Sequence, residues 1–150
     1  MAGRYYDQWQ IGDRIAHEIR RTVTETDNLL FSTMTHNPQP LHLDIEAAKA
    51  SEFGRILVNG TFTFALMVGL SVGDTTLGTL VANLGYDRLV HPKPVFIGDT
   101  MRAETEVAAL KESKSRRNAG IVTFTHRLIN QRDEIVCQCL RSALLLRTPA

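Results

Sequence analysis

Residues 60–72 of the chain read GTFTFALMVGLSV, and this stretch decides the fold. Its apolar residues lie nearly all round a helical projection, a pattern typical of a helix that is buried on every side. The sequence predicts that this helix begins at Gly60 and ends at Gly73 and Asp74. A helix of this kind needs a second layer of structure that covers it.

Three long strands are predicted downstream, at residues 100–109, 121–129 and 135–146. In the first of them, apolar or small side chains at the odd positions alternate with charged side chains at positions 102, 104 and 106. This alternation is typical of an antiparallel strand with one buried face. Hairpin loops at 112–120 and 130–133 join the three strands, and residues 77–89 predict a further strand before a turn at Pro92 and Pro94.

The first half of the chain is mainly helical. After a short strand at 14–23, Thr24 and Asp27 resemble a capping box for a helix that runs to about Thr35, with Leu30, Phe31 and Met34 as its apolar face. Prolines 38 and 40 stop that helix, and Asp44 is expected to cap a second one at 44–51. Because helices and strands are segregated, we predict an α+β fold with one domain over residues 1–150. An antiparallel sheet wrapped around one long buried helix is the hot-dog arrangement.

Composition gives no electrostatic argument for a nucleic-acid or membrane partner. The chain carries 17 basic and 16 acidic residues and a net charge of +1, so nothing favours binding to nucleic acid or to a membrane surface. The polar residues 1–10 lack the apolar core of a signal peptide, and the apolar stretch 56–72 is interrupted and shorter than a membrane span. We therefore expect a cytoplasmic protein.

Cysteine and histidine positions give little indication of a metal site. Cys137 and Cys139 share one face of a strand and are expected to be small core residues in a reducing compartment. His126 alternates with apolar residues, which predicts a core or interface position. The remaining histidines outside the site described next are expected at the surface or in loops: His17, His36 and His91. No pair of histidines has metal-ligand spacing, so no metal is expected.

The chemistry is expected in residues 35–44, which read THNPQPLHLD. A double-proline loop fixes its own shape, so it holds Asn37 and His42 rigidly toward one bound molecule. Histidine has an unperturbed pKa near neutrality and can both take and give a proton. Gly60 opens the buried helix, where free N–H groups and the helix dipole favour negative charge. Its N–H can stabilise the oxygen of a thioester as that oxygen becomes more negative.

This segment resembles the signature of MaoC-like dehydratases and R-specific enoyl-CoA hydratases, a Gly-Asp-x-Asn-Pro-Leu-His-x-Asp loop followed by a helix that opens with His-Gly. The stretch 94–100, PVFIGDT, is similar to a later motif of the family, and the resemblance extends from residue 11 to the last strand. It implies Asn37, His42 and Gly60 as the catalytic group, with an enoyl-CoA or 3-hydroxyacyl-CoA as substrate and a homodimer as the assembly. It implies no metal or redox cofactor, since CoA is part of the substrate.

The chain departs from the family signature at three positions. The catalytic aspartate of the family falls on Asn37, its asparagine on Gln39, and the histidine before the helix glycine on Asn59. Because an amide cannot take a proton, His42 is either the sole acid and base, or a carboxylate such as Asp44 or Glu46 contributes, or activity is weak or lost. The variant loop is similar to that of mesaconyl-CoA hydratases and related branched dicarboxyl-CoA hydratases. The expected substrate-binding residues are Gln39, Asp44, Asn59, Thr61, Arg88 and Lys93.

Structural roles remain open for each of the catalytic candidates. His42 can bond to backbone, Asn37 can serve as a helix stop, and Gly60 can permit close packing of the helix. Two functions compete with hydration. A hot-dog thioesterase normally needs a carboxylate on the buried helix, and residues 60–73 contain none. A non-catalytic acyl-CoA-binding protein is favoured only by the loss of the aspartate at position 37.

Overall fold

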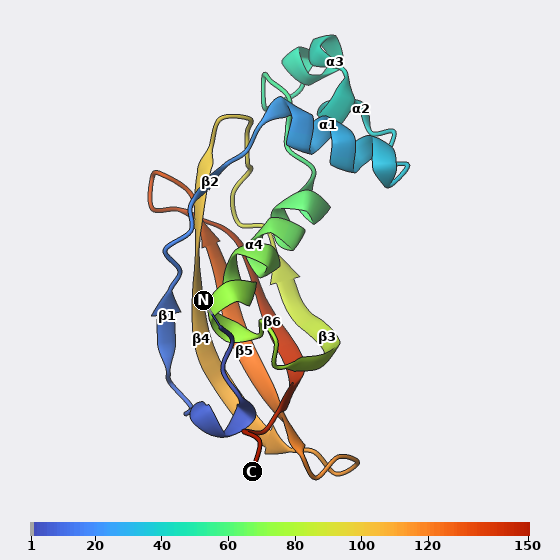
Figure 1. Cartoon of the computed structure of the whole chain (residues 1–150). Helices are drawn as coiled ribbons and strands as arrows, with labels where there is room; N and C mark the ends of the chain where they lie inside the picture. The colour runs from blue at the N-terminus through green and yellow to red at the C-terminus, as the bar shows by residue number, and fades with distance from the viewer. Residues whose placement is uncertain (1) are drawn as a thin grey trace.

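The computed structural model describes residues 2–150 and consists of an antiparallel sheet that curves around a single long helix, α4 (Gly60–Thr75) (Figure 1). The six-stranded sheet has the order β1-β4-β5-β6-β3, and the short β2 pairs beside β1 with the same strand, β4. The strands are β1 (Arg14–Ala16), β2 (Arg21–Thr22), β3 (Leu80–Val90), β4 (Thr100–Glu112), β5 (Ala119–Ile129) and β6 (Ile135–Leu146). The predicted α+β, hot-dog architecture is confirmed.

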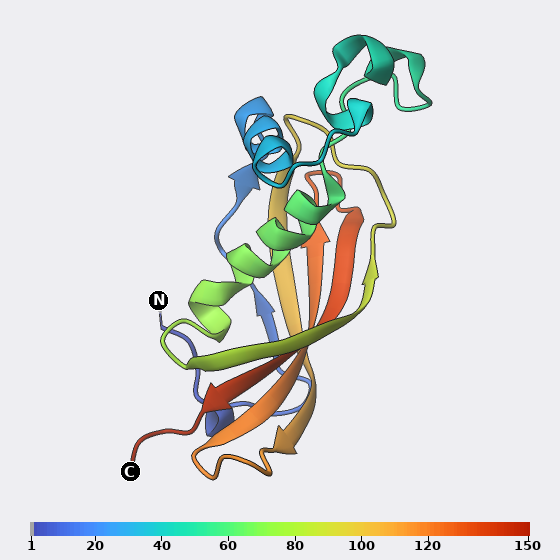
Figure 2. The ribbon, with the colours of Figure 1, turned by 90° about the vertical axis from the view of Figure 1, so that its right-hand side faces the viewer.

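Three short helices gather at one end of the sheet, beside the beginning of α4 (Figure 2). They are α1 (Glu25–Met34), α2 (Pro40–Leu43) and α3 (Ile45–Ala50), and a 3-10 turn, η1 (Tyr6–Gln8), lies near the N-terminus. The predicted caps are confirmed: Thr24 and Asp27 form a capping box on α1, and Asp44 accepts bonds from the first backbone N–H groups of α3. Both predictions concerned residues within one turn of the helix that they cap, where local chemistry decides the outcome.

Several predicted boundaries were wrong. The strand expected at 14–23 is broken into β1 and β2, and the helix expected to end at Gly73 and Asp74 continues to Thr75. The proline segment contains a short helix, α2, because Pro40 occupies its first position, where the missing N–H costs nothing. The long helix is also not buried on every side, since Thr61, Ala65 and Gly69 form an exposed stripe.

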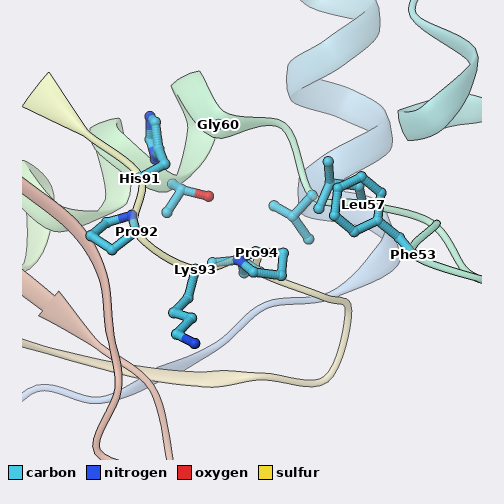
Figure 3. A pocket seen from close by; sticks show the side chains of 10 residues that line it. Phe53, Leu57, Gly60, His91, Pro92, Lys93 and Pro94 are labelled. Atoms are coloured by element: carbon cyan, nitrogen blue, oxygen red, sulfur yellow. The ribbon is translucent and has the colours of Figure 1, made fainter.

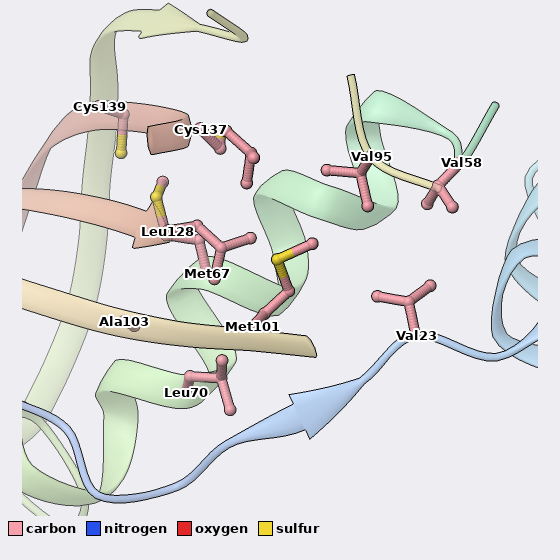
Figure 4. Close-up of a cluster of buried hydrophobic side chains, with 11 residues drawn as sticks. Val23, Val58, Met67, Leu70, Val95, Met101, Ala103, Leu128, Cys137 and Cys139 are labelled. Atoms are coloured by element: carbon pink, nitrogen blue, oxygen red, sulfur yellow. The ribbon is translucent and has the colours of Figure 1, made fainter. Parts of the chain in front are cut away.

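The main core lies between α4 and the sheet (Figure 4). Met67 of α4 is fully buried against Met101 of β4 and Leu128 of β5. Cys137 and Cys139 of β6 lie in the same cluster, as predicted, and burial raises the pKa of their thiols to about 12 and about 11. A second cluster, around Trp9, Val122 and Phe124, covers the other end of the sheet.

A chain of buried polar side chains runs beneath the C-terminal end of α4. His17 lies 2.8 Å from Asp74 through Nδ1 and 2.7 Å from Thr105 Oγ1 through Nε2, and Thr105 Oγ1 lies 2.8 Å from His126 Nδ1. The prediction that His17 lies at the surface was therefore wrong, because partners from α4 and β4 enclose it. His126 is buried, as predicted. Nearby Arg141 is 1% exposed, and its charge acts on His126.

No helix in the described part of the chain, residues 2–150, is long and apolar enough to cross a membrane.

Candidate active site

The loop between α1 and α2 holds Asn37 through its own backbone. The Asn37 N–H donates to the carbonyl of Ser32 at 2.9 Å, and Asn37 Oδ1 accepts from the N–H of Gln39 at 3.1 Å. This Asx turn is a common use of asparagine before proline. Since the backbone N–H can only donate, the turn fixes Oδ1 toward it and leaves the Nδ2 donors of Asn37 for another group.

His42 is fixed by one hydrogen bond that also sets its tautomer. Its Nδ1 lies 2.7 Å from the carbonyl oxygen of Leu57, the segment that leads into α4. A carbonyl oxygen only accepts, so Nδ1 carries the hydrogen and Nε2 of the neutral ring carries the lone pair. Among residues 2–150, no group hydrogen-bonds to Nε2. His42 thus presents an oriented base atom.

Asn28 positions both halves of the site, and the sequence analysis missed it. Its Nδ2 donates to the carbonyl of His42 at 2.9 Å, and its Oδ1 accepts from the N–H of Asn59 at 2.9 Å. The buried face of α1 therefore contains Asn28 and Ser32, whereas Leu30 and Met34 are 57% and 68% exposed. The expected apolar face of α1 was wrong, because backbone groups far along the chain required polar partners there.

The start of α4 combines one capped and one free N–H. Asn59 is 2% exposed; its Oδ1 accepts from the N–H of Thr61 at 3.0 Å, and its Nδ2 donates to Ser32 Oγ at 3.2 Å. The N–H of Gly60 has no acceptor within residues 2–150. The first N–H groups of a helix lack partners within the helix, and this one remains available to a ligand.

A cavity of about 360 Å³ opens beside Gly60 (Figure 3). Its walls come from the segment before α4, the first turn of α4 and the proline-rich segment after β3. The lining is mostly apolar and contains no aspartate or glutamate: Phe53, Leu57, Val58, Gly60, Thr63, His91, Pro92, Lys93, Pro94 and Val95. Such a pocket, with a few polar groups at one wall, suits a small organic ligand.

The predicted site residues are distributed unevenly around this cavity. Gly60 and Lys93 line it, and His42 adjoins it through the carbonyl of Leu57. Asn37 lies one loop away, on the segment that leads to His42. His91, which the sequence analysis assigned to a surface or loop, is indeed exposed but lines the cavity above Gly60.

Five of the six predicted substrate-binding residues lie outside the cavity lining, and one of them is Asn59, which is buried at the cap of α4. Gln39 precedes α2 and is exposed, Thr61 is on the exposed stripe of α4, and Arg88 is exposed on β3 with a positive φ of 52°. Asp44 Oδ1 accepts from two N–H groups of α3, and Glu46 pairs with Lys49 at 2.8 Å. Neither carboxylate therefore stands free beside His42.

Comparison with known sequences matches residues 7–128 to the family described as the MaoC like domain. The mesaconyl-CoA hydratase of Cereibacter sphaeroides is 36% identical over 140 residues, which cover 93% of this chain and 40% of that protein. The (R)-specific enoyl-CoA hydratase of Aeromonas caviae is 37% identical over 101 residues, covering 67% of this chain and 70% of that protein. The beta-methylmalyl-CoA dehydratase of Chloroflexus aurantiacus is 27% identical over 93% of this chain. The chain spans 40% of the length of the Cereibacter sphaeroides protein and 39% of the length of this dehydratase.

Comparison with solved structures gives the same fold. The MaoC-like dehydratase from Rhodospirillum rubrum superposes with a TM-score of 0.86 at 32% identity, covering 99% of this chain and 100% of that one. A Mycobacterium tuberculosis protein described as a double hot-dog fold superposes with a TM-score of 0.88 at 22% identity, covering 98% of this chain and 45% of that one. At that identity the second likeness concerns the fold alone.

Proposed function

This chain belongs to the MaoC-like domain family, and from that premise we propose that it interconverts an enoyl-CoA and the matching 3-hydroxyacyl-CoA. The observation that carries the proposal is the hydrogen bond of His42 Nδ1 to the carbonyl of Leu57, a residue that lines the cavity, because this bond leaves Nε2 as the unpaired base atom of the neutral ring. The named relatives support the same class of reaction, since they are hydratases and dehydratases of CoA thioesters.

The proposed reaction needs a single acid–base group. In the hydration direction, His42 Nε2 takes a proton from water while the water oxygen bonds to the β-carbon of the enoyl group. The electron pair of the double bond moves toward the thioester oxygen, which the Gly60 N–H stabilises. The proton on Nε2 then passes to the α-carbon, so the elements of water are added and His42 is regenerated.

Asn37 takes a positioning role in this scheme. Its Oδ1 is occupied by the Gln39 N–H, so its Nδ2 group donates to the oxygen of the water or of the 3-hydroxyl group. An amide neither gains nor loses a proton near neutral pH, which leaves all proton transfer to His42. Asp44 and Glu46 are engaged elsewhere, which disfavours the alternative of a second carboxylate.

The CoA portion extends from the open side of the cavity, where exposed basic residues lie. We expect Lys93, which lines the cavity, and Arg88, which is exposed on β3, to meet its phosphates in charge-assisted contacts. Gln39 and Thr61 are exposed near the same end, whereas Asn59 and Asp44 act through their helix caps. No metal or redox cofactor enters the proposed reaction.

We also infer a homodimer in the cytoplasm. Strand β3 is an edge of the sheet within this chain, and its exposed side chains include Leu84, Tyr86, Leu89 and Val90. An apolar edge strand is a template for pairing, and proteins normally cover it. A second copy that pairs along β3 buries these side chains, and sedimentation velocity tests this assembly directly.

Two rival functions differ from hydration in their products. A thioesterase needs a base or nucleophile at the thioester carbon, and no carboxylate lines the cavity among residues 2–150. A binding protein would leave the substrate unchanged. Crotonyl-CoA and mesaconyl-CoA are therefore mixed with the protein while absorbance of the enoyl-thioester band and free thiol are recorded, with His42→Ala as the control.

Loss of the enoyl band without thiol release, absent in the control, is the expected result. Thiol release would instead identify a thioesterase. Binding of both thioesters with no change in either signal would contradict hydration of these substrates.

A further inference from the structure

His91 is the one polar side chain whose ring stands directly over the start of α4 in the cavity (Figure 3). A Cβ atom built on Gly60 would lie 3.4 Å from His91 Nε2, so the ring lies directly beside Gly60 at the start of α4. Neither ring nitrogen of His91 has a hydrogen-bond partner in residues 2–150. This histidine therefore has unused donor capacity next to the thioester position.

The lining of this cavity contains no acidic side chain. The cavity lining holds His91 and Lys93 but no carboxylate, and the first turn of α4 adds the positive end of a 16-residue helix. Thr63 adds a hydroxyl that donates to the carbonyl of Asn59. The rest of the wall is apolar, with Phe53 and Leu57 across the cavity from His91 (Figure 3). An anion bound against such walls requires a hydrogen-bond donor, and the ring of His91 can provide it.

The two basic residues of the lining are directed differently. The ring of His91 lies against the start of α4, whereas the side chain of Lys93 extends away from it (Figure 3). Lys93 is thus suited to the outer part of a CoA ester, and His91 to a charge on the acyl group itself. Lys93 and His91 would thus recognise different parts of the substrate, the CoA portion and the acyl group.

We propose that His91 is a specificity-determining residue that binds the free carboxylate of a short dicarboxylic acyl-CoA. The inference rests on the proposed hydratase function, because it names the substrate class of the same site. The acyl group lies with its thioester oxygen at the Gly60 N–H and its second carboxylate at the His91 ring, while the apolar wall contacts its carbon chain or a methyl branch. A monocarboxylic acyl group of equal length lacks the group that His91 recognises.

The test compares two saturated thioesters that cannot be hydrated, succinyl-CoA and butyryl-CoA, whose acyl groups have the same number of carbons. Dissociation constants of both are measured for the wild-type chain and for His91→Leu. The wild-type protein is expected to bind succinyl-CoA at least about tenfold more tightly, because a charge-assisted bond is lost with butyryl-CoA. In His91→Leu that ratio is expected to fall to about one.

Three further variants exclude simpler explanations. Lys93→Met is expected to weaken the binding of both thioesters alike, so the preference for succinyl-CoA over butyryl-CoA stays unchanged. If the preference came instead from the overall positive charge of the cavity, this variant would lower it too. His91→Gln replaces the ring by another side chain with an N–H donor and is expected to retain part of the preference. Lys114→Leu removes an exposed side chain from the hairpin at the opposite end of the sheet and is the control for binding and thermal unfolding.

The outcomes distinguish this inference from the hydratase proposal. Equal binding of the two thioesters by the wild-type chain overturns the inference, and an unchanged ratio in His91→Leu overturns the assignment to His91. If succinyl-CoA is preferred but neither crotonyl-CoA nor mesaconyl-CoA is hydrated, the carboxylate site stands and the hydratase proposal fails. If crotonyl-CoA is hydrated and succinyl-CoA is not preferred, the reverse holds.

Discussion

The two ends of α4 both carry polar groups, but these groups have opposite surroundings. At the N-terminal end, the Gly60 N–H, His42 Nε2 and the ring of His91 have no partner within residues 2–150; Gly60 and His91 line an open cavity, and His42 bonds to Leu57, which also lines it. At the C-terminal end, Asp74, His17, Thr105 and His126 bond to one another beneath the helix. Polar groups that have no partner at an accessible site can bind a ligand, whereas polar groups that bond to one another inside the protein stabilise the fold.

The enclosed end also contains two buried side-chain nitrogens that have no hydrogen-bond partner within residues 2–150. His126 Nε2 and Arg141 Nη1 are buried and unpaired within the described residues. Arg141 bonds only to neutral groups, Asn83 at 2.8 Å and Thr76 at 3.4 Å, and burial lowers its pKa. These groups affect the stability of the fold, since burying a charge without a counter-ion is costly. Changes at this end should therefore alter stability rather than catalysis.

The largest effect is expected from His42→Ala at the open end. Removing the only acid–base group should lower kcat by about a thousandfold. The lost bond to Leu57 is partly exposed, so the unfolding free energy should fall by only about 1 kcal/mol. Initial rates of enoyl-band loss and urea titration measure the two quantities. A variant that retains a tenth of wild-type kcat would show that His42 is not the acid–base group.

A smaller effect on catalysis is expected from Asn37. In Asn37→Ala both the turn to Gln39 and the Nδ2 donor are lost, and kcat should fall between about tenfold and a hundredfold. Asn37→Asp keeps an acceptor for the turn but presents an anion where Nδ2 donated. If kcat of Asn37→Asp stays at least about tenfold below wild type, the Nδ2 donor matters; a kcat at or above wild type would contradict the donor role, because the aspartate that the family signature has at this position can itself transfer a proton.

At the enclosed end, the measurable quantity is the pH dependence of stability. Burial above all, followed by the charge of Arg141, lowers the pKa of His126 to about 3. An unfolded histidine titrates near pH 6.5, so below that pH the unfolded chain takes up a proton that the folded chain excludes. This contribution to stability is complete above pH 6.5 and is lost as the pH falls toward 3. It amounts to roughly 2 kcal/mol between pH 7 and pH 5.

The variant His126→Asn isolates this effect. Asparagine places an amide where Nδ1 bonds to Thr105 but does not titrate, so the difference in unfolding free energy between pH 7 and pH 5 should shrink by roughly 2 kcal/mol. Urea unfolding at the two pH values gives this difference, and kcat at pH 7 should change less than about twofold. An unchanged pH slope would mean that His126 is not the group responsible.

The contrast between the two ends also separates what the sequence could predict from what it could not. The Asn37–His42 loop, the cap at Thr24 and the start of α4 at Gly60 depend on residues a few positions apart, and all were predicted. His17 was misplaced because Asp74 and Thr105 lie 57 and 88 residues away. His91 lines the cavity only because the segment after β3 returns to the start of α4, and no local pattern around residue 91 indicates that contact.

The smallest effect is expected at the outer edge of the enclosed chain, where Asp74 meets His17. The Asp74 side chain is 31% exposed, and its partner atom is His17 Nδ1. In Asp74→Asn an oxygen can still accept from Nδ1–H, so a neutral His17 keeps its bond and the unfolding free energy should fall by less than about 1 kcal/mol. Asp74→Ala removes the acceptor and should cost more than Asp74→Asn, while kcat changes in neither variant. Equal losses would show that the charge of Asp74, and therefore a charged His17, stabilises the pair; a fall in kcat in either variant would contradict the separation between the two ends of α4.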